Sequence, residues 1–279
     1  MSKCNRRSPV PLLVMFLVLV FLYIPLVTVA WMSFNAAGIG EWEGFSLKWY
    51  WLLKDHSDIW DALKNTLIVG AVATMISTVL GTLAALALHR SKNKLKGIYN
   101  ALIYTPLVVP DILMGIGLLL LFVLVIQTFG AWFSALTGIP VKLGMTTVII
   151  AHVTFCMSYV TMVVLGRLQE FDKSLIEAAQ DLGASSFYTF FHVTLPGIMP
   201  GIMAGALFAF TLSIDDYVIT FFVNGSSYET LPILIEGAMR KPKNMPILNA
   251  LSVVFLMFTF IAVFFAQKLL TNKTENKKK

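Results

Sequence analysis

Charged residues and cysteines are both scarce in this chain of 279 residues. Asp, Glu, Lys and Arg together make up 13% of it, about half of the roughly 25% that is usual in soluble proteins. The only cysteines, Cys4 and Cys156, form neither a C-x-x-C pair nor a metal-ligand spacing. These shortages argue against a soluble globular domain, against a disulfide framework and against a cysteine-based metal centre.

The chain also lacks a nucleotide-binding loop of the form GxxxxGK[ST]. We therefore expect no ATP hydrolysis, no catalytic residue and no cofactor of its own; any ATP and Mg would be used by another subunit. His152 and His192 stand alone, without the spacing of metal ligands. We interpret both as polar groups satisfied by hydrogen bonds inside the fold.

Apolar residues are abundant instead. They make up 57% of the chain, and the mean hydropathy is +0.79. A helix needs about 20 such residues to cross a hydrocarbon core about 30 Å thick. The sequence therefore predicts an all-α polytopic membrane protein with a single transmembrane domain over 1–279. Its six spans are expected near 12–32, 64–88, 98–126, 146–166, 198–222 and 247–270.

The distribution of Lys and Arg predicts the orientation of these spans. With a cytoplasmic N-terminus, the inside segments carry twice as many Lys and Arg residues as the outside loops. Both termini are therefore expected in the cytoplasm, and the net charge of +6 reflects topology and anionic lipid rather than nucleic acid. The first span is expected to stay as a signal-anchor, because its apolar run exceeds the 7–15 residues of a cleaved signal peptide.

Proline and small residues indicate irregular or close-packed points in the spans. Pro25, Pro106 and Pro110 are expected to kink or break their helices, and a broken helix at membrane depth is tolerated where it lines a cavity. Ser77 and Gly81 lie four apart, which favours close approach of a neighbouring helix. The external loop 33–63 is rich in Trp, which is typical either of a segment on the outer leaflet or of a surface for an external partner.

The longest cytoplasmic loop, 167–196, has helical signals of its own. Ser174 and Glu177 have the S-x-x-E spacing of a capping box, so a helix is predicted to begin at Ser174. Gly183 fits the left-handed position just past its end. Ser185 is predicted to cap a second short helix that runs to Pro196. From these signals alone, the loop is either a connector on the bilayer surface or a docking element.

The same loop resembles a known motif. Glu177-Ala178-Ala179, Gly183 and Val193-x-Leu195-Pro196 are similar to the EAA motif of ABC importer permeases, although that family prefers Ile where Val193 stands. In the family, this cytoplasmic helix docks in a cleft of the ATPase subunit. The resemblance implies an ATPase-coupling role for Glu177, Ala178, Ala179, Asp181, Leu182, Gly183 and Pro196.

Further segments extend the resemblance from about Tyr23 to Leu270. Phe21–Pro25, Gly44–Tyr50, Pro110–Ile112, Phe210–Asp216 and Ser227–Pro232 resemble the spermidine/putrescine branch of these permeases. The resemblance implies a type I importer fold in the bacterial cytoplasmic (inner) membrane. It also implies a sister permease, a dimer of ATPase subunits, an extracytoplasmic polyamine-binding protein and a polyamine substrate. The alternative substrate is another small cation or metabolite.

Three carboxylates lie in predicted spans, where each costs about 2.5–3.5 kcal/mol at a helix centre. Asp111, Asp215 and Asp216 are therefore expected to face a bundle interior or an aqueous path for cations. Side chains of adjacent helical residues diverge by about 100°, so only one of Asp215 and Asp216 can face a pore squarely. The other is expected to pair with a sister subunit or to end a helix.

Aromatic rings can also bind ammonium groups, by cation–π contact. Tyr159 and Tyr217 are the candidates for this role on the pathway, together with Tyr104, although a Tyr in a span more often packs.

Two other classes of function are weighed against a transporter subunit. An intramembrane aspartyl protease needs two carboxylates that share a proton, and Asp111 and Asp215 could form such a pair. The chain lacks a GxGD signature, however, and this hypothesis leaves the loop 167–196 unexplained. An ungated channel or a structural membrane protein is the third class.

Overall fold

The computed structural model describes residues 10–37, 40–91, 94–138, 142–225, 228–240 and 245–275. Over these residues the chain is helical, and its only β-type pairing is an isolated bridge between Asn35 and Phe45. Among them, five helices are long and apolar enough to cross a membrane, and Met245–Ile261 is a shorter apolar helical segment. The chain forms two compact units, one within 1–57 and 235–262 and the other within 58–234 and 263–279.

The first unit contains α1 (Val10–Met32), α2 (Lys48–Asp55) and the loop between them. No residue of α1 is buried within the protein. In the loop, the buried Asn35 side chain donates to the carbonyl of Glu41 and accepts from the N–H of Glu43. The Trp49 indole donates to the carbonyl of Asn35 at 2.8 Å. This part of the expected outer loop is therefore an ordered, aromatic-rich structure.

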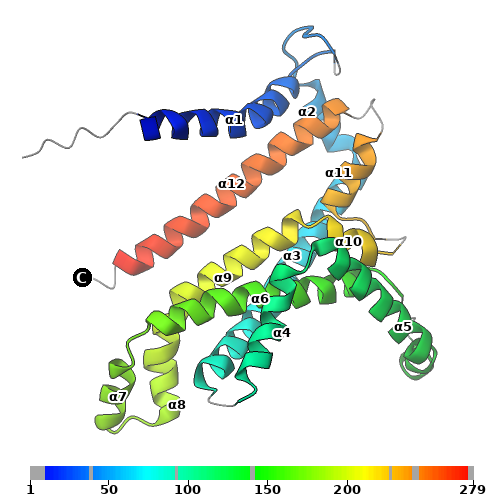
Figure 1. Cartoon of the computed structure of the whole chain (residues 1–279). Coiled ribbons are helices and arrows are strands. Elements are labelled where there is room, and N and C mark those ends of the chain that lie inside the picture. The colour runs from blue at the N-terminus through cyan, green and yellow to red at the C-terminus, as the bar shows by residue number, and fades with distance from the viewer. Residues whose placement is uncertain are drawn as a thin grey trace, which may run out of the picture. The chain divides into compact units, whose positions relative to one another are not determined.

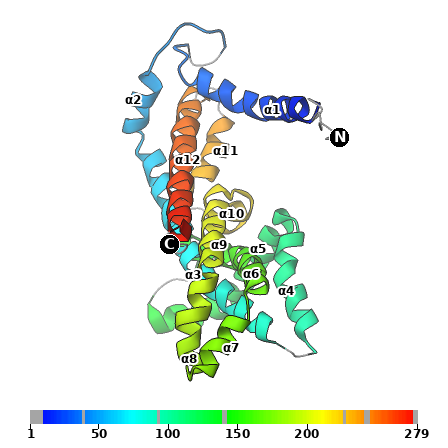
Figure 2. The ribbon, with the colours of Figure 1, turned by 90° about the vertical axis from the view of Figure 1, so that its left-hand side faces the viewer.

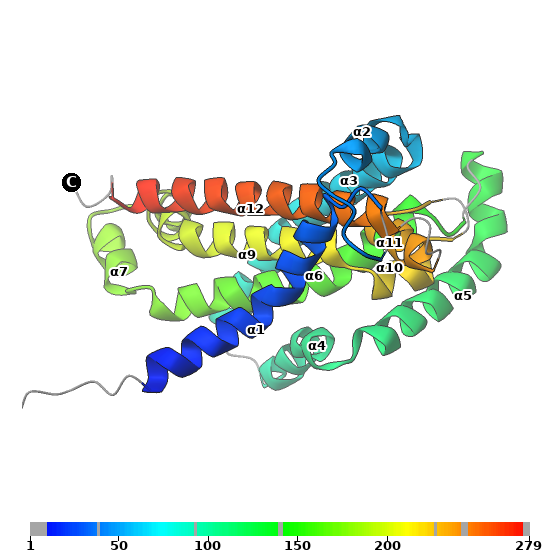
Figure 3. The ribbon, with the colours of Figure 1, turned by 90° about the horizontal axis from the view of Figure 1, so that it is seen from above.

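The second unit is organised around α6 (Met145–Glu170), which lies beside α9 (Leu195–Asp215) (Figures 1 and 3). Gly197, Gly201 and Gly205 repeat every four residues on α9. A Cβ placed on Gly201 would lie 2.7 Å from the Cβ of Arg167, closer than real Cβ atoms approach. Gly201 therefore allows the two helices to pack closely.

A third helix, α3 (Ser57–Arg90), also approaches α6 closely. A Cβ on Gly81 would lie 2.8 Å from the Cβ of Val160. The predicted close approach at Gly81 is confirmed, and Val160 is fully buried. The core of this unit includes Val148, Ala151, Phe155, Val160 and Val164 of α6, with Ile198 and Ala209 of α9.

The expected single span 98–126 is wrong, because the structure divides it into two helices. α4 (Lys96–Val108) ends before Pro110, and α5 (Asp111–Thr137) begins after it. Proline lacks an N–H and forces the preceding residue into an extended conformation, which Val109 adopts with ψ 130°. The predicted break at Pro110 is thus confirmed, whereas α1 and α4 continue through Pro25 and Pro106.

The expected span 198–222 is also interrupted. α9 ends at Asp215, and the short helix α10 (Val218–Val223) begins after two residues. α10 packs on α5 and α6, and Figure 3 shows α5 extending beyond it. The other expected spans overlap with α1, α3, α6 and α12 (Met245–Glu275); α11 (Leu231–Met239) precedes α12.

The segment after α6 begins with α7 (Ser174–Asp181), at the predicted residue. The predicted capping box is not formed there. Instead, the Asp172 carboxylate accepts from the N–H of Ser174 at 2.9 Å, and the hydrogen bonds from Ser174 lower the pKa of Asp172 below its usual value. Gly183 adopts the predicted left-handed conformation, with φ +86°. The prediction that Ser185 caps the next helix, α8 (Ser186–Thr189), is also confirmed.

The second helix of this segment was expected to end at Pro196, but it does not. It continues through the π-helical turn η1 (Phe190–Thr194) into α9. Pro196 has no N–H for an α-helical bond, and its ring would clash with the carbonyl four residues back. The wider turn, in which Leu195 N–H bonds to the carbonyl of Phe190 five residues earlier, brings the chain past this position.

Candidate functional site

The five residues predicted for the pathway all lie in the second unit, but their environments differ. Asp215, the last residue of α9, and Asp111, the first residue of α5, are exposed. The side chain of Asp216 is only 9% exposed. The adjacent carboxylates of Asp215 and Asp216 therefore differ in exposure, and the reason is not the 100° helical step that we expected, because Asp216 lies past the end of α9 with an extended backbone.

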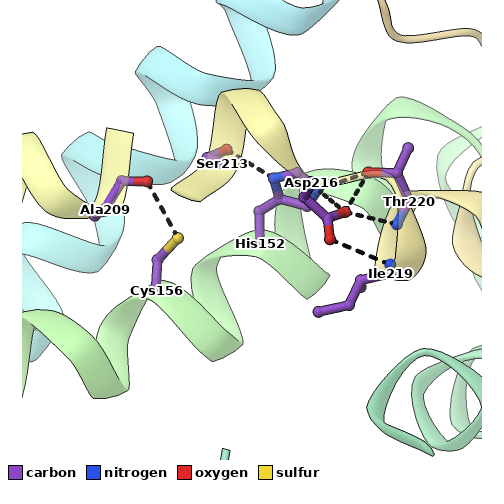
Figure 4. A network of polar contacts seen from close by, with 7 residues as sticks. All are labelled: His152, Cys156, Ala209, Ser213, Asp216, Ile219 and Thr220. Atoms are coloured by element: carbon purple, nitrogen blue, oxygen red, sulfur yellow. Dashed lines mark hydrogen bonds and ion pairs between the residues drawn. The ribbon is translucent and has the colours of Figure 1, made fainter. Parts of the chain in front are cut away.

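Asp216 is tied to the start of α10 (Figure 4). Its Oδ1 accepts from the N–H of Ile219 at 3.2 Å, and its Oδ2 accepts from the N–H and the hydroxyl of Thr220 at 2.8 and 2.7 Å. A carboxylate in this place satisfies N–H groups that have no partner within their own helix, and it interacts favourably with the helix dipole. Asp216 thus caps α10.

A buried histidine completes the arrangement. His152 of α6 is 0% exposed, and its Nδ1 lies 2.7 Å from the hydroxyl of Ser213 on α9. Its Nε2 lies 2.9 Å from the hydroxyl of Thr220 and 3.3 Å from Asp216 Oδ2 (Figure 4). The prediction that His152 is a satisfied polar group is confirmed. Sequence reasoning missed its partners, because they lie more than 60 residues away along the chain.

This burial opposes the expectation that Asp216 faces a path for substrate. It agrees instead with the alternative that one of the two adjacent acids ends a helix. Tyr217, the next residue, is half-buried and contacts Phe221 with ring centroids 5.6 Å apart. Of the acidic pair in span 198–222, only Asp215 remains available to a ligand.

An open groove of about 840 Å³ runs between α6 and α9. Its lining includes Tyr159, Met162, Arg167, Glu170, Pro200 and Phe208. The Tyr159 ring meets the Phe208 ring edge-on, with centroids 5.4 Å apart. Arg167 is paired with Glu170 at 3.3 Å.

The exposed side of α9 connects this groove with Asp215. Positions three and four apart share one face of a helix, and Pro200, Ala204, Phe208, Thr211 and Asp215 follow this spacing. All five are exposed. We call this set the α9 face; it carries an aromatic ring, a hydroxyl and a carboxylate in succession.

The predicted coupling residues lie mainly at the surface. Glu177, Ala178, Asp181, Leu182 and Gly183 are exposed, whereas Ala179 and Pro196 are partly buried. Leu182 is 89% exposed and Phe187 is 75% exposed. α7 and α8 lie side by side beyond the ends of α6 and α9 (Figure 2). The segment therefore presents two large apolar side chains next to the carboxylates of α7.

A family described as "Binding-protein-dependent transport system inner membrane component" matches residues 77–275. The chain is 40% identical to the putrescine transport system permease protein PotI of Escherichia coli (strain K12), over 93% of this chain and 90% of the relative. It is 35% identical to the spermidine/putrescine transport system permease protein PotC of the same strain, over 91% of each chain.

Solved structures share the fold at low identity. A bacterial ABC transporter involved in the import of the acidic polysaccharide alginate matches with a TM-score of 0.74 and 17% identity, over 94% of this chain and 93% of its own. The MetNI methionine ABC transporter matches with a TM-score of 0.60 and 18% identity, over 82% of this chain and 99% of its own. The fold is therefore that of an ABC importer permease.

The contrast between the two adjacent acids predicts unequal effects of their replacement on stability. Asp216→Ala leaves two N–H groups and the Thr220 hydroxyl without their acceptor, so it should cost about 2–4 kcal/mol. Its apparent melting temperature in detergent should fall by roughly 5–10 °C. Asp215→Ala, the matched control at an exposed site, should shift it little. Equal shifts for the two variants would contradict the assignment of Asp216 as a cap.

Proposed function

This chain belongs to the family of inner membrane components of binding-protein-dependent transport systems, and we propose that it forms half of the translocation pathway of an ATP-driven polyamine importer. The observation that carries the substrate class is the α9 face, which leads from Phe208 to the exposed carboxylate of Asp215. The protease and channel hypotheses are not retained, because members of this family are transport components.

The chemistry of the α9 face suits a flexible diamine or triamine. Such a cation loses hydration as it crosses, and the carboxylates of Asp215 on this face and of Asp111 at the start of α5 offset part of this loss. The Tyr159 and Phe208 rings can take ammonium groups by cation–π contact. Few acids and two aromatic rings make a weak, multi-site path, from which a polycation can also leave.

The similarity to permeases for putrescine and for spermidine/putrescine supports the same substrate class. The fold alone does not, since a transporter of the acidic polysaccharide alginate shares it. The exposed carboxylate of Asp215 on the α9 face would repel such an anion. The alternative substrate is another small cation or metabolite, which an uptake assay with several ligands distinguishes.

Coupling to ATP hydrolysis is assigned to the segment from α7 to α8. The exposed Leu182 and Phe187 would fill an apolar cleft on a partner ATPase, while Glu177 and Asp181 flank it with charge. The full importer would contain two ATPase subunits, a sister permease and an extracytoplasmic polyamine-binding protein. The chain would lie in the bacterial cytoplasmic membrane with both termini in the cytoplasm.

Uptake of labelled putrescine and spermidine tests the substrate. The chain is expressed with its ATPase, sister permease and binding protein in cells that lack polyamine import. We expect ATP-dependent uptake that falls roughly tenfold in Asp215→Asn, because a charged partner of the cation is lost. The control Asp55→Asn removes an exposed acid outside the α9 face and should retain uptake. An assembled, ATP-hydrolysing complex that moves no polyamine would refute the substrate class.

The turn at Gly183 tests the coupling role. Proline fixes φ near −65° and lacks an N–H, whereas Gly183 has φ +86° and donates to the carbonyl of Gln180. Gly183→Pro should therefore insert in the membrane but lose ATPase assembly or substrate-stimulated ATP hydrolysis. Gly117→Ala on α5, where a Cβ has open space, is the control. Full transport by Gly183→Pro would rule out this assignment.

A further inference from the structure

The corner between α9 and α10 determines where the α9 face ends. Asp215 is the last residue of α9, and only Asp216 and Tyr217 separate it from α10. Asp216 has an extended backbone, with φ −68° and ψ 119°. A helix end followed by two non-helical residues is free to fray unless other groups hold it. The direction of the Asp215 side chain therefore depends on what fixes this corner.

The hydrogen bonds at the corner are all satisfied when the imidazole of His152 is neutral. The Thr220 hydroxyl donates its single proton to Asp216 Oδ2 at 2.7 Å, so its oxygen is left to accept from His152 Nε2–H at 2.9 Å. His152 Nδ1 then accepts from the Ser213 hydroxyl at 2.7 Å (Figure 4). A neutral imidazole that carries its proton on Nε2 fulfils all of these bonds.

The imidazole therefore connects two helices from the side. It joins Ser213, in the last turn of α9, to Thr220, in the first turn of α10, and it is itself held in the buried core of α6. Ser213 lies two residues before Asp215, and Asp216 directly follows Asp215. Both sides of the exposed acid are thus anchored to one side chain of a neighbouring helix.

We propose that His152 is a positioning residue for transport, which holds Asp215 in the direction that meets the substrate. This inference rests on the proposed function, because it assigns His152 a role through Asp215. His152 itself is buried and touches no substrate. Without the imidazole, the Ser213 and Thr220 hydroxyls lose a buried partner and the corner can reorient.

Cys156 offers a matched control on the same helix. It lies one turn from His152, is fully buried and contacts α9 through the carbonyl of Ala209 at 3.5 Å. It therefore ties α6 to α9 in the same region but has no contact with the corner in the described network (Figure 4). Cys156→Ala removes a buried α6 side chain without changing the link to Asp215.

A double-mutant cycle separates positioning from structure. The complete importer is reconstituted in liposomes with saturating binding protein, and the readout is putrescine transported per ATP hydrolysed. A merely structural defect lowers the amount of assembled complex but leaves this ratio unchanged. We expect Asp215→Asn to lower the ratio roughly tenfold and His152→Ala roughly fivefold, with Cys156→Ala near wild type.

The double variant decides between the two roles. If His152 acts through Asp215, adding His152→Ala to Asp215→Asn should lower the ratio no further. A further roughly fivefold loss in the double variant would overturn the positioning role, because independent effects multiply. An unchanged ratio in Asp215→Asn alone would instead refute the proposed pathway.

Ser213→Ala keeps the test valid if His152→Ala fails to assemble. It removes the hydroxyl that pairs with His152 Nδ1 and leaves the remaining bonds of the corner in place. We expect a smaller loss in the same ratio, roughly twofold to threefold, that also disappears in the Asp215→Asn background. A loss that persists in that background would contradict the proposal.

Discussion

The close contact between α6 and α9 is the constraint on which the second unit depends. Gly201 lets α9 approach α6 at a distance that a side chain would prevent. This contact determines which side of α9 is buried, and therefore which side forms the exposed α9 face. It also brings His152 within hydrogen-bond distance of the end of α9. The same helix contact thus determines both the packing of this unit and the position of the candidate pathway.

Buried polar groups give that contact its specificity. Apolar helices in lipid gain little from hydrophobic association, so small-residue packing and hydrogen bonds decide which faces meet. At the α9–α10 corner, the carboxylate of Asp216 offsets its burial by accepting several hydrogen bonds. The same bonds stop α9 at Asp215, and this leaves one acid inside and its neighbour outside.

Local sequence signals predicted the local structure well. Apolar runs located most of the long helices, and Pro110, Gly183 and Ser185 marked a break, a turn and a cap that the structure contains. The burial of Asp216 could not be predicted, because it depends on His152, which lies far away along the chain. The π-helical turn η1 before Pro196 was missed for a different reason. A helix that meets a proline either ends or continues through a wider turn, and only tertiary packing decides between the two.

Cysteine accessibility tests the central claim, that the α9 face lines the path of a polyamine. Thr211→Cys, in a chain whose Cys4 and Cys156 are replaced by Ala, would be treated with a membrane-impermeant thiol reagent in the assembled, cycling importer. The account predicts labelling that saturating putrescine slows, while Met75→Cys on α3, at a position 70% exposed, shows no putrescine effect. A Thr211→Cys variant that is not labelled, or whose labelling putrescine leaves unchanged, would contradict it.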